Sequence, residues 1–145
     1  NGDEISRVCY LDFGRSEVET QISELIVIKE ELKLCISNIS GWAKPKKVRT
    51  PFQLQPGSSY IQYEPYGTVL VIAPWNFPYN QLLRAAVPNI LAGNTQVYKH
   101  ASNVPLCAQG IEQLFIEAGF PEGVYTNIYI SSSQSEHIIA HPAIR

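Results

Sequence analysis

Three short, apolar, β-prone runs in the second half of the chain start about 30 residues apart, the interval of a strand–helix–strand unit. The runs span residues 68–73, 95–99 and 126–130, and helical patterns at 80–92 and 105–118 separate them. Runs without polar alternation are typical of strands buried on both faces of a parallel sheet. The sequence therefore predicts an α/β fold with a β-α-β-α-β sheet. A further helix is expected after Ser133, and another strand where the chain stops.

The first third of the chain carries one long helical pattern. Ser16 and Glu19 have the spacing of a capping box at its start, and Gly41 is a natural stop. Acidic residues concentrate near the start of this pattern and basic residues follow its end, as the helix dipole favours. We expect residues 1–47 to form a helical segment.

Residues 48–64 lack the helical pattern and are instead rich in β-prone residues. Two extended runs, 48–54 and 59–63, flank a Gln-Pro-Gly-Ser turn sequence, so a β-hairpin is predicted. Pro51 places the first run at an edge. Because a two-stranded ribbon is marginal in water, it must lie against something else. Residues 65–145 would then form a partial α/β domain.

Several functional classes are disfavoured by charge and composition. A net charge of −2 gives no field to attract nucleic acid or an anionic membrane. No apolar run approaches the 18 residues of a membrane span, and no targeting segment can be read. Three cysteines without a CxxC pair indicate reduced, buried thiols of an intracellular, cytoplasmic protein. The three histidines lack metal-ligand partners at suitable spacing, so no metal site is expected.

The candidate chemistry lies directly after the first apolar run. There, Asn76 stands between Trp75 and Phe77, at the sheet edge where α/β folds place ligands. An amide fixed by such neighbours can donate to an oxyanion. The alternative is an Asn near the N-cap of the next helix. Lys99, after the second run, is either solvated or reaches a ribose or phosphate. Cys107 has no base nearby in sequence and is interpreted as a packing thiol.

Several motifs resemble the NAD(P)-dependent aldehyde dehydrogenase superfamily. They are PYGTVLVIAPWNFP at 65–78, VP at 87–88, LAGNT at 91–95, VYK at 97–99 and EAGFPEGV at 117–124. Within the superfamily, LDFGRS at 11–16 and the stretches 42–51 and 59–67 are similar to the branch that acts on aromatic and fatty aldehydes. RAAVP at 84–88 and KHASNV at 99–104 are more similar to succinate-semialdehyde dehydrogenases.

The resemblance implies a variant Rossmann sheet, which would explain why the chain has no GxGxxG motif. It makes Asn76 the side-chain donor of the oxyanion hole and Lys99 a contact to the adenosine ribose. It assigns the walls of the cofactor cleft to Ile72, Ala73, Pro74 and Trp75. The family's catalytic Cys, general-base Glu and glycine-bearing helix are expected beyond Arg145. The chain is thus interpreted as the N-terminal portion of such an enzyme, and residues 1–145 alone are expected to be inactive.

Cofactor choice follows from the residues after Lys99. Many relatives place Pro directly after this lysine and Glu three residues after it, whereas this chain has His100 and Ser102. Ser102 would not repel a 2′-phosphate, while Lys99 and His100 would supply positive charge. NADP⁺ is therefore expected to be accepted, with NAD⁺ also possible. In the alternative interpretation, Ser102 only caps the helix that starts at Pro105.

The resemblance also makes the hairpin an oligomerisation arm, so a homodimer or homotetramer is expected for the complete enzyme. The predicted activity is oxidation of an aldehyde to a carboxylic acid with NAD(P)⁺. The alternative is a non-catalytic nucleotide-binding or assembly module that retains half of the fold. A reading frame that continues past Arg145 into a Gly-rich helix and a reactive Cys would favour the enzyme.

Overall fold

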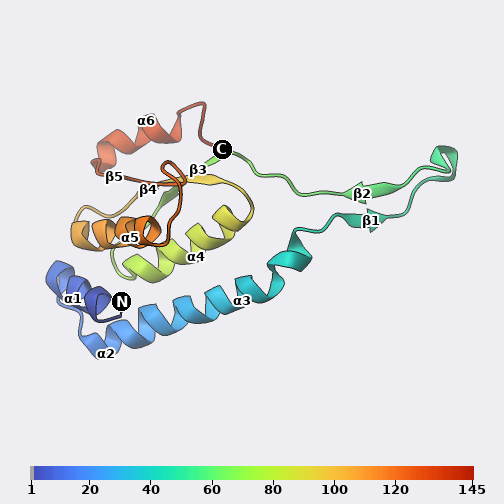
Figure 1. Ribbon diagram of the computed structural model, residues 1–145. Coiled ribbons are helices and arrows are strands. Elements are labelled where there is room, and N and C mark those ends of the chain that lie inside the picture. The colour runs from blue at the N-terminus through green and yellow to red at the C-terminus, as the bar shows by residue number, and fades with distance from the viewer. Residues whose placement is uncertain (1) are drawn as a thin grey trace.

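The computed structural model describes residues 2–145 and arranges them in layers from which one hairpin projects (Figure 1). The helices are α1 (Gly2–Phe13), α2 (Glu17–Thr20), α3 (Val27–Trp42), α4 (Pro78–Leu91), α5 (Pro105–Glu117) and α6 (Ser135–Ile139). The strands are β1 (Lys46–Val48), β2 (Ser59–Ile61), β3 (Thr68–Ile72), β4 (Thr95–Lys99) and β5 (Tyr125–Ile128). Helices α4 and α5 cover one face of the β3–β5 sheet, α1 to α3 lie beyond them, and α6 lies on the other side.

The predicted sheet is confirmed. Strands β3, β4 and β5 pair in parallel in that order, with Leu70 opposite Val97 and Val97 opposite Thr126. At the end of the chain, Ile144 bridges to Thr68 in parallel, and the Arg145 N–H donates to the Thr68 carbonyl at 3.0 Å. The strand expected there therefore begins to pair along the edge of β3 that β4 leaves open.

The prediction that these strands are buried on both faces is wrong within residues 2–145. In β4, Gln96 and Tyr98 are fully buried, whereas Thr95 and Val97, on the other face, are only half-buried. The Gln96 side chain donates to the Ala86 carbonyl of α4 at 2.6 Å, so the buried face is the one that α4 and α5 cover. Strand β3 is half-buried and ends in the exposed Ile72, because no described element covers its other face to the same extent.

The predicted long helix is confirmed, with a widened turn near its start. Helix α2, a π-helical segment (Gln21–Ile26) and α3 follow one another without a break. The Ser16 hydroxyl accepts the Glu19 N–H at 3.3 Å, as a cap should. The helix runs one residue past Gly41 to Trp42. Residues 1–47 were expected to be helical, but α1 was not predicted as a separate helix. Gly14, with φ +74°, makes the turn that separates it from α2.

Helices α4 and α5 receive their N-terminal caps from this helical segment. Each starts with Pro at its first position and has an apolar N-cap residue without a capping side chain. The Asp12 carboxylate accepts the Leu106 and Cys107 N–H groups at 3.3 and 2.7 Å. The Glu24 carboxylate likewise accepts the Asn80 N–H in the first turn of α4 at 2.5 Å. The interpretation of Ser102 as the cap of α5 is therefore wrong, because Asp12 fills that role.

The hairpin exists, but its predicted strands are partly wrong. Strand β1 pairs antiparallel with β2, with Lys47 opposite Tyr60. Residues 49–58 connect them and contain a 3-10 turn (Phe52–Leu54) preceded by Pro51. Pro51 lacks an N–H for the ladder, and the Thr50 hydroxyl instead accepts the Ser59 N–H at 2.9 Å. The hairpin extends away from the layers (Figure 1). Among the described residues, each helix is too short or too polar to traverse a bilayer.

Candidate functional site

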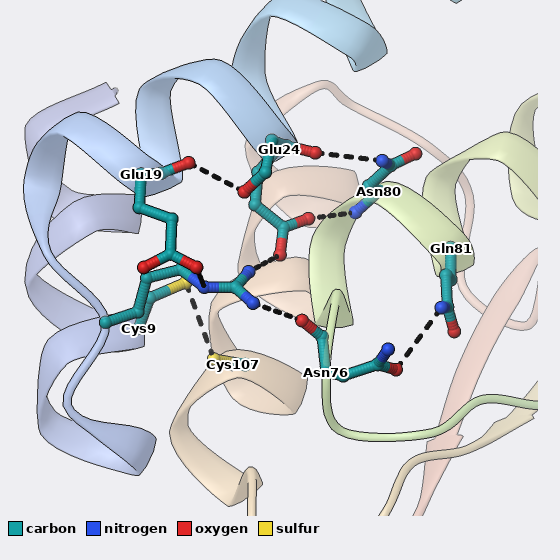
Figure 2. A network of polar contacts seen from close by, with 9 residues as sticks. Cys9, Glu19, Glu24, Asn76, Asn80, Gln81 and Cys107 are labelled. Carbon is teal, nitrogen blue, oxygen red and sulfur yellow. Dashed lines mark hydrogen bonds and ion pairs between the residues drawn. The ribbon is translucent and has the colours of Figure 1, made fainter.

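Asn76 lies in the turn between β3 and α4, at the carboxyl end of the sheet. Its Oδ1 accepts a hydrogen bond from Gln81 Nε2 at 3.3 Å, and Figure 2 shows the two side chains pointing toward each other. Within residues 2–145, Asn76 Nδ2 donates to no acceptor. Phe77 is the N-cap residue of α4, so Asn76 lies directly before the N-cap, as the alternative interpretation expected. In the described part of the chain, α4 has no side-chain cap bond from its N-cap residue. The amide has a fixed oxygen and a nitrogen available to donate, as a candidate oxyanion donor requires.

Arg15 holds the backbone of this turn. Its Nη2 donates to the Asn76 carbonyl oxygen. The guanidinium lies over the rings of Phe13 and Phe77, 4.8 and 4.7 Å from the ring centroids. Arg15 is buried, although arginine is seldom buried without a charged partner. The turn that carries Asn76 is therefore anchored to the segment between α1 and α2.

Glu24 is that partner and lies in the π-helical segment. Its Oε1 accepts Arg15 Nη1 at 2.7 Å, and its Oε2 accepts the Asn80 N–H at 2.5 Å (Figure 2). The Asn80 side chain donates to the Ser23 carbonyl at 2.9 Å. Burial raises the pKa of Glu24 to about 7, although the Asn80 N–H and Arg15 act in the opposite direction. Glu24 thus caps α4 and balances the charge of Arg15.

Sequence reasoning missed this pair as functional residues. Arg15 appeared only within the LDFGRS motif, and Glu24 only as one acid of an acid-rich helix. Asn80 and Glu24 are 56 positions apart in the chain, and Asn76 and Arg15 are 61 apart. The one local signal was an arginine directly before Ser16, the predicted start of the long helix, and two residues after Phe13.

The predicted walls of the cofactor cleft surround the ends of β3 and β4. The Ala73 N–H donates to the Lys99 carbonyl at 3.1 Å, which brings the two strand ends side by side. Ala73 is buried, whereas Ile72 and Trp75 are 49% and 50% exposed and Pro74 is also exposed. The Trp75 ring meets Phe13 edge to face at 6.3 Å between centroids. Ile72, Pro74 and Trp75 together present an apolar edge.

Lys99 is 7% exposed, and its Nζ donates to the His100 carbonyl at 3.1 Å, so the solvated alternative is wrong. His100 is also buried, and neither ring nitrogen has a partner in the described part of the chain. Burial, followed by the charge of Lys99, lowers the pKa of His100 to about 4. The imidazole is therefore neutral at neutral pH, and the expectation that His100 adds a positive charge is wrong. Ser102 is exposed in the following turn.

The three cysteines are free and buried, as predicted. The Sγ atoms of Cys9 and Cys107 lie 4.0 Å apart between α1 and α5. Contact with Cys9 and burial raise the pKa of Cys107, which keeps it a packing thiol. No group of three potential metal ligands was found in residues 2–145.

Two hollows lie away from this edge. One of about 770 Å³ runs between α1 and α5, and an apolar one of about 420 Å³ lies among α3, α4 and α5. Asn76, Lys99 and Ser102 line neither of them. The candidate site is instead the open edge at the carboxyl ends of β3 and β4.

Comparison with known proteins gives consistent similarities. The model of the aldehyde dehydrogenase family matches residues 1–145. A succinate-semialdehyde dehydrogenase [NADP(+)] of Deinococcus radiodurans is 34% identical over 99% of this chain and 29% of its own length. A succinate semialdehyde dehydrogenase [NAD(P)+] of Escherichia coli is 53% identical over 52% of this chain and 16% of its own.

Solved structures agree in fold. The succinic semialdehyde dehydrogenase of Streptococcus pyogenes, crystallised with NADP⁺ as the cofactor, has a TM-score of 0.88 and 31% identity. The match covers 98% of this chain and 30% of that one. The chain thus spans less than a third of the length of the relatives that it matches along nearly all of its residues.

Proposed function

The chain belongs to the aldehyde dehydrogenase family, and from this premise we propose that the complete enzyme oxidises an aldehyde to a carboxylic acid with NAD(P)⁺. Asn76 carries the proposal. Its Oδ1 is held by Gln81, its backbone is held by Arg15, and its Nδ2 is left to donate at the carboxyl edge of the sheet. These contacts support a role as a preorganised donor to the oxyanion that forms when a nucleophile attacks the aldehyde carbonyl.

The nucleophile and the general base are proposed to come from outside residues 1–145. Cys107 and Cys9 are buried against each other, and Cys35 is buried in α3. Contact with Cys9 and burial raise the pKa of Cys107, so the thiolate needed for attack is disfavoured there. Residues 1–145 alone should therefore oxidise no aldehyde.

The residues at the strand ends fit a nicotinamide dinucleotide in part. Ile72, Pro74 and Trp75 leave apolar surface exposed where α/β sheets bind such ligands. Ala73 is buried behind them and joins the two strand ends. One N–H of the Lys99 ammonium donates to the His100 carbonyl, and the other two are available to ribose or phosphate oxygens. Ser102 has an exposed hydroxyl group. The chemistry that such a cofactor supplies when bound is hydride acceptance.

Assembly and compartment are further parts of the proposal. The hairpin carries exposed aromatic residues with no described cover, among them Phe52 at 88% and Tyr63 at 79%. We propose that it packs against another copy of the chain in a homodimer or homotetramer. Three free, buried thiols are typical of a reducing compartment, so the cytoplasm is proposed.

Replacing Asn76 by Ala in the complete enzyme tests the function. The substitution should lower kcat by about 100- to 1,000-fold, since it removes one oxyanion donor. Asn89→Ala is the matched control, because Asn89 is also half-buried and lies on α4, and within residues 2–145 its side chain bonds only the Ala85 carbonyl. A loss below about tenfold for Asn76→Ala would remove the oxyanion role.

A further inference from the structure

The turn that carries Asn76 has few backbone bonds of its own. At its start the Ala73 N–H donates to Lys99, and at its end the Gln81 N–H donates to the Phe77 carbonyl at 3.0 Å. Between these two bonds, the Asn76 carbonyl accepts from Arg15. Arg15 therefore fixes the peptide group that adjoins the Asn76 side chain.

Arg15 is itself held rigidly from several sides. Glu24 accepts from Nη1 at 2.7 Å, Glu19 lies 3.5 Å from Nε, and Phe13 and Phe77 enclose the guanidinium plane. The planar fork of an arginine has little freedom when so enclosed. Phe77 is also the N-cap residue of α4, so Arg15 contacts both Asn76 and the residue that starts the helix.

Glu24 also holds the first turn of α4. It accepts the Asn80 N–H, while Asn80 Nδ2 bonds the Ser23 carbonyl (Figure 2). Gln81, which bonds Asn76 Oδ1, is the next residue of that helix. The buried ion pair of Arg15 and Glu24 thus holds two parts of the site. It fixes the backbone of Asn76, and it fixes α4, which carries Gln81.

We infer that Arg15, held by Glu24, is a positioning residue that aims the Asn76 amide at the developing oxyanion. This inference rests on the proposed function. A preorganised donor contributes most when it needs no rearrangement during the reaction. A misplacement of about 1 Å can reduce a rate by about 100-fold. Loss of the Arg15 contact should therefore let the turn that carries Asn76 move, and so lower kcat while the protein remains folded.

The test is a double-mutant cycle in the complete enzyme. Arg15→Lys keeps the charge opposite Glu24 but loses the fork that also reaches the Asn76 carbonyl. It should lower kcat by about tenfold or more, with a smaller change in KM. On an Asn76→Ala background it should change kcat less than about twofold, because Arg15 acts through that side chain.

Two further variants make the cycle decisive. Glu24→Gln removes the charge that holds Arg15 and is the second variant if Arg15→Lys does not fold. Its loss in kcat should likewise disappear on the Asn76→Ala background. Asp12→Asn is the matched control, because Asp12 caps α5 and does not contact the Asn76 turn. It should lower thermal stability and leave kcat at saturating cofactor within about twofold.

The outcomes separate the two proposals. Equal kcat losses from Arg15→Lys with and without Asn76, or no loss with Asn76 present, would overturn the positioning role alone. A loss below about tenfold for Asn76→Ala by itself would overturn the oxyanion role and the positioning role together.

Discussion

At the level of single residues, we propose that Ser102 faces the 2′-phosphate when NADP⁺ is bound. It is exposed and lies three residues after Lys99. A carboxylate about 4 Å from a phosphate charge is repelled by about 4 kcal/mol at an effective dielectric of about 20, before solvent screening reduces it. We predict that Ser102→Glu lowers kcat/KM for NADP⁺ by about tenfold or more and changes that for NAD⁺ much less.

Gln109→Glu adds the same charge at an exposed position of α5 and serves as the control. If the parent enzyme already prefers NAD⁺ by more than about tenfold and Ser102→Glu changes neither value, Ser102 does not face the phosphate.

His100 should make the protein sensitive to acid. Burial lowers its pKa from 6.5 to about 4 in the folded state. A lowered pKa means that the unfolded chain takes up the proton first, so the stabilisation is complete above pH 6.5 and is lost as pH falls toward 4. The shift corresponds to about 3 kcal/mol.

His100→Gln should therefore flatten the fall in unfolding free energy between these two pH values. His137→Gln, at an exposed position, is the control. Parallel stability curves for the wild type and His100→Gln would contradict the burial of a neutral imidazole.

Among the elements, α5 depends on a cap from another helix. Asp12 accepts two of its first N–H groups, and Val104 at the N-cap position supplies none. We predict that Asp12→Ala lowers the free energy of unfolding by about 1–2 kcal/mol, measured by denaturant titration. Glu122→Ala removes the same charge from an exposed turn and should have little effect. Equal losses for the two variants would show that charge, and not capping, matters.

The elements also show what could be predicted from the sequence. β4 was predicted to the residue and β3 to within one, because apolar runs between helical patterns are local signals. The first hairpin strand was wrong beyond Val48, because Pro51 ends the pairing. Helix α1 was missed as a separate helix because it offers no capping motif, and its buried face is short: Ile5, Ser6, Val8 and Cys9.

The site was predictable only in its local part. Asn76 and the strand ends follow from their position after apolar runs. Asp12 and Glu24, the caps of α5 and α4, lie 95 and 56 positions from the N–H groups they bind, so no short motif contains either pair. The burial of Lys99 and His100 likewise depends on packing between elements that the sequence does not place.

At the scale of the whole molecule, the hairpin leaves aromatic residues exposed that another copy of the chain is proposed to cover. Its two three-residue strands cannot cover Phe52 and Tyr63. We predict that Phe52→Ser combined with Tyr63→Ser shifts the complete enzyme to a smaller assembly in sedimentation. Ile116→Ser, at another exposed apolar position on α5, should leave the assembly unchanged. An unchanged sedimentation profile for the hairpin variant would contradict its role in assembly.

The whole molecule also sets the most direct test of the proposed function. Steady-state turnover in such enzymes can be limited by product release, which hides an effect on chemistry. The single-turnover rate of aldehyde oxidation, at saturating NADP⁺ and aldehyde, should fall about 100- to 1,000-fold in Asn76→Ala. A single-turnover rate within about tenfold of the wild type would contradict the proposal that the Asn76 amide stabilises the oxyanion.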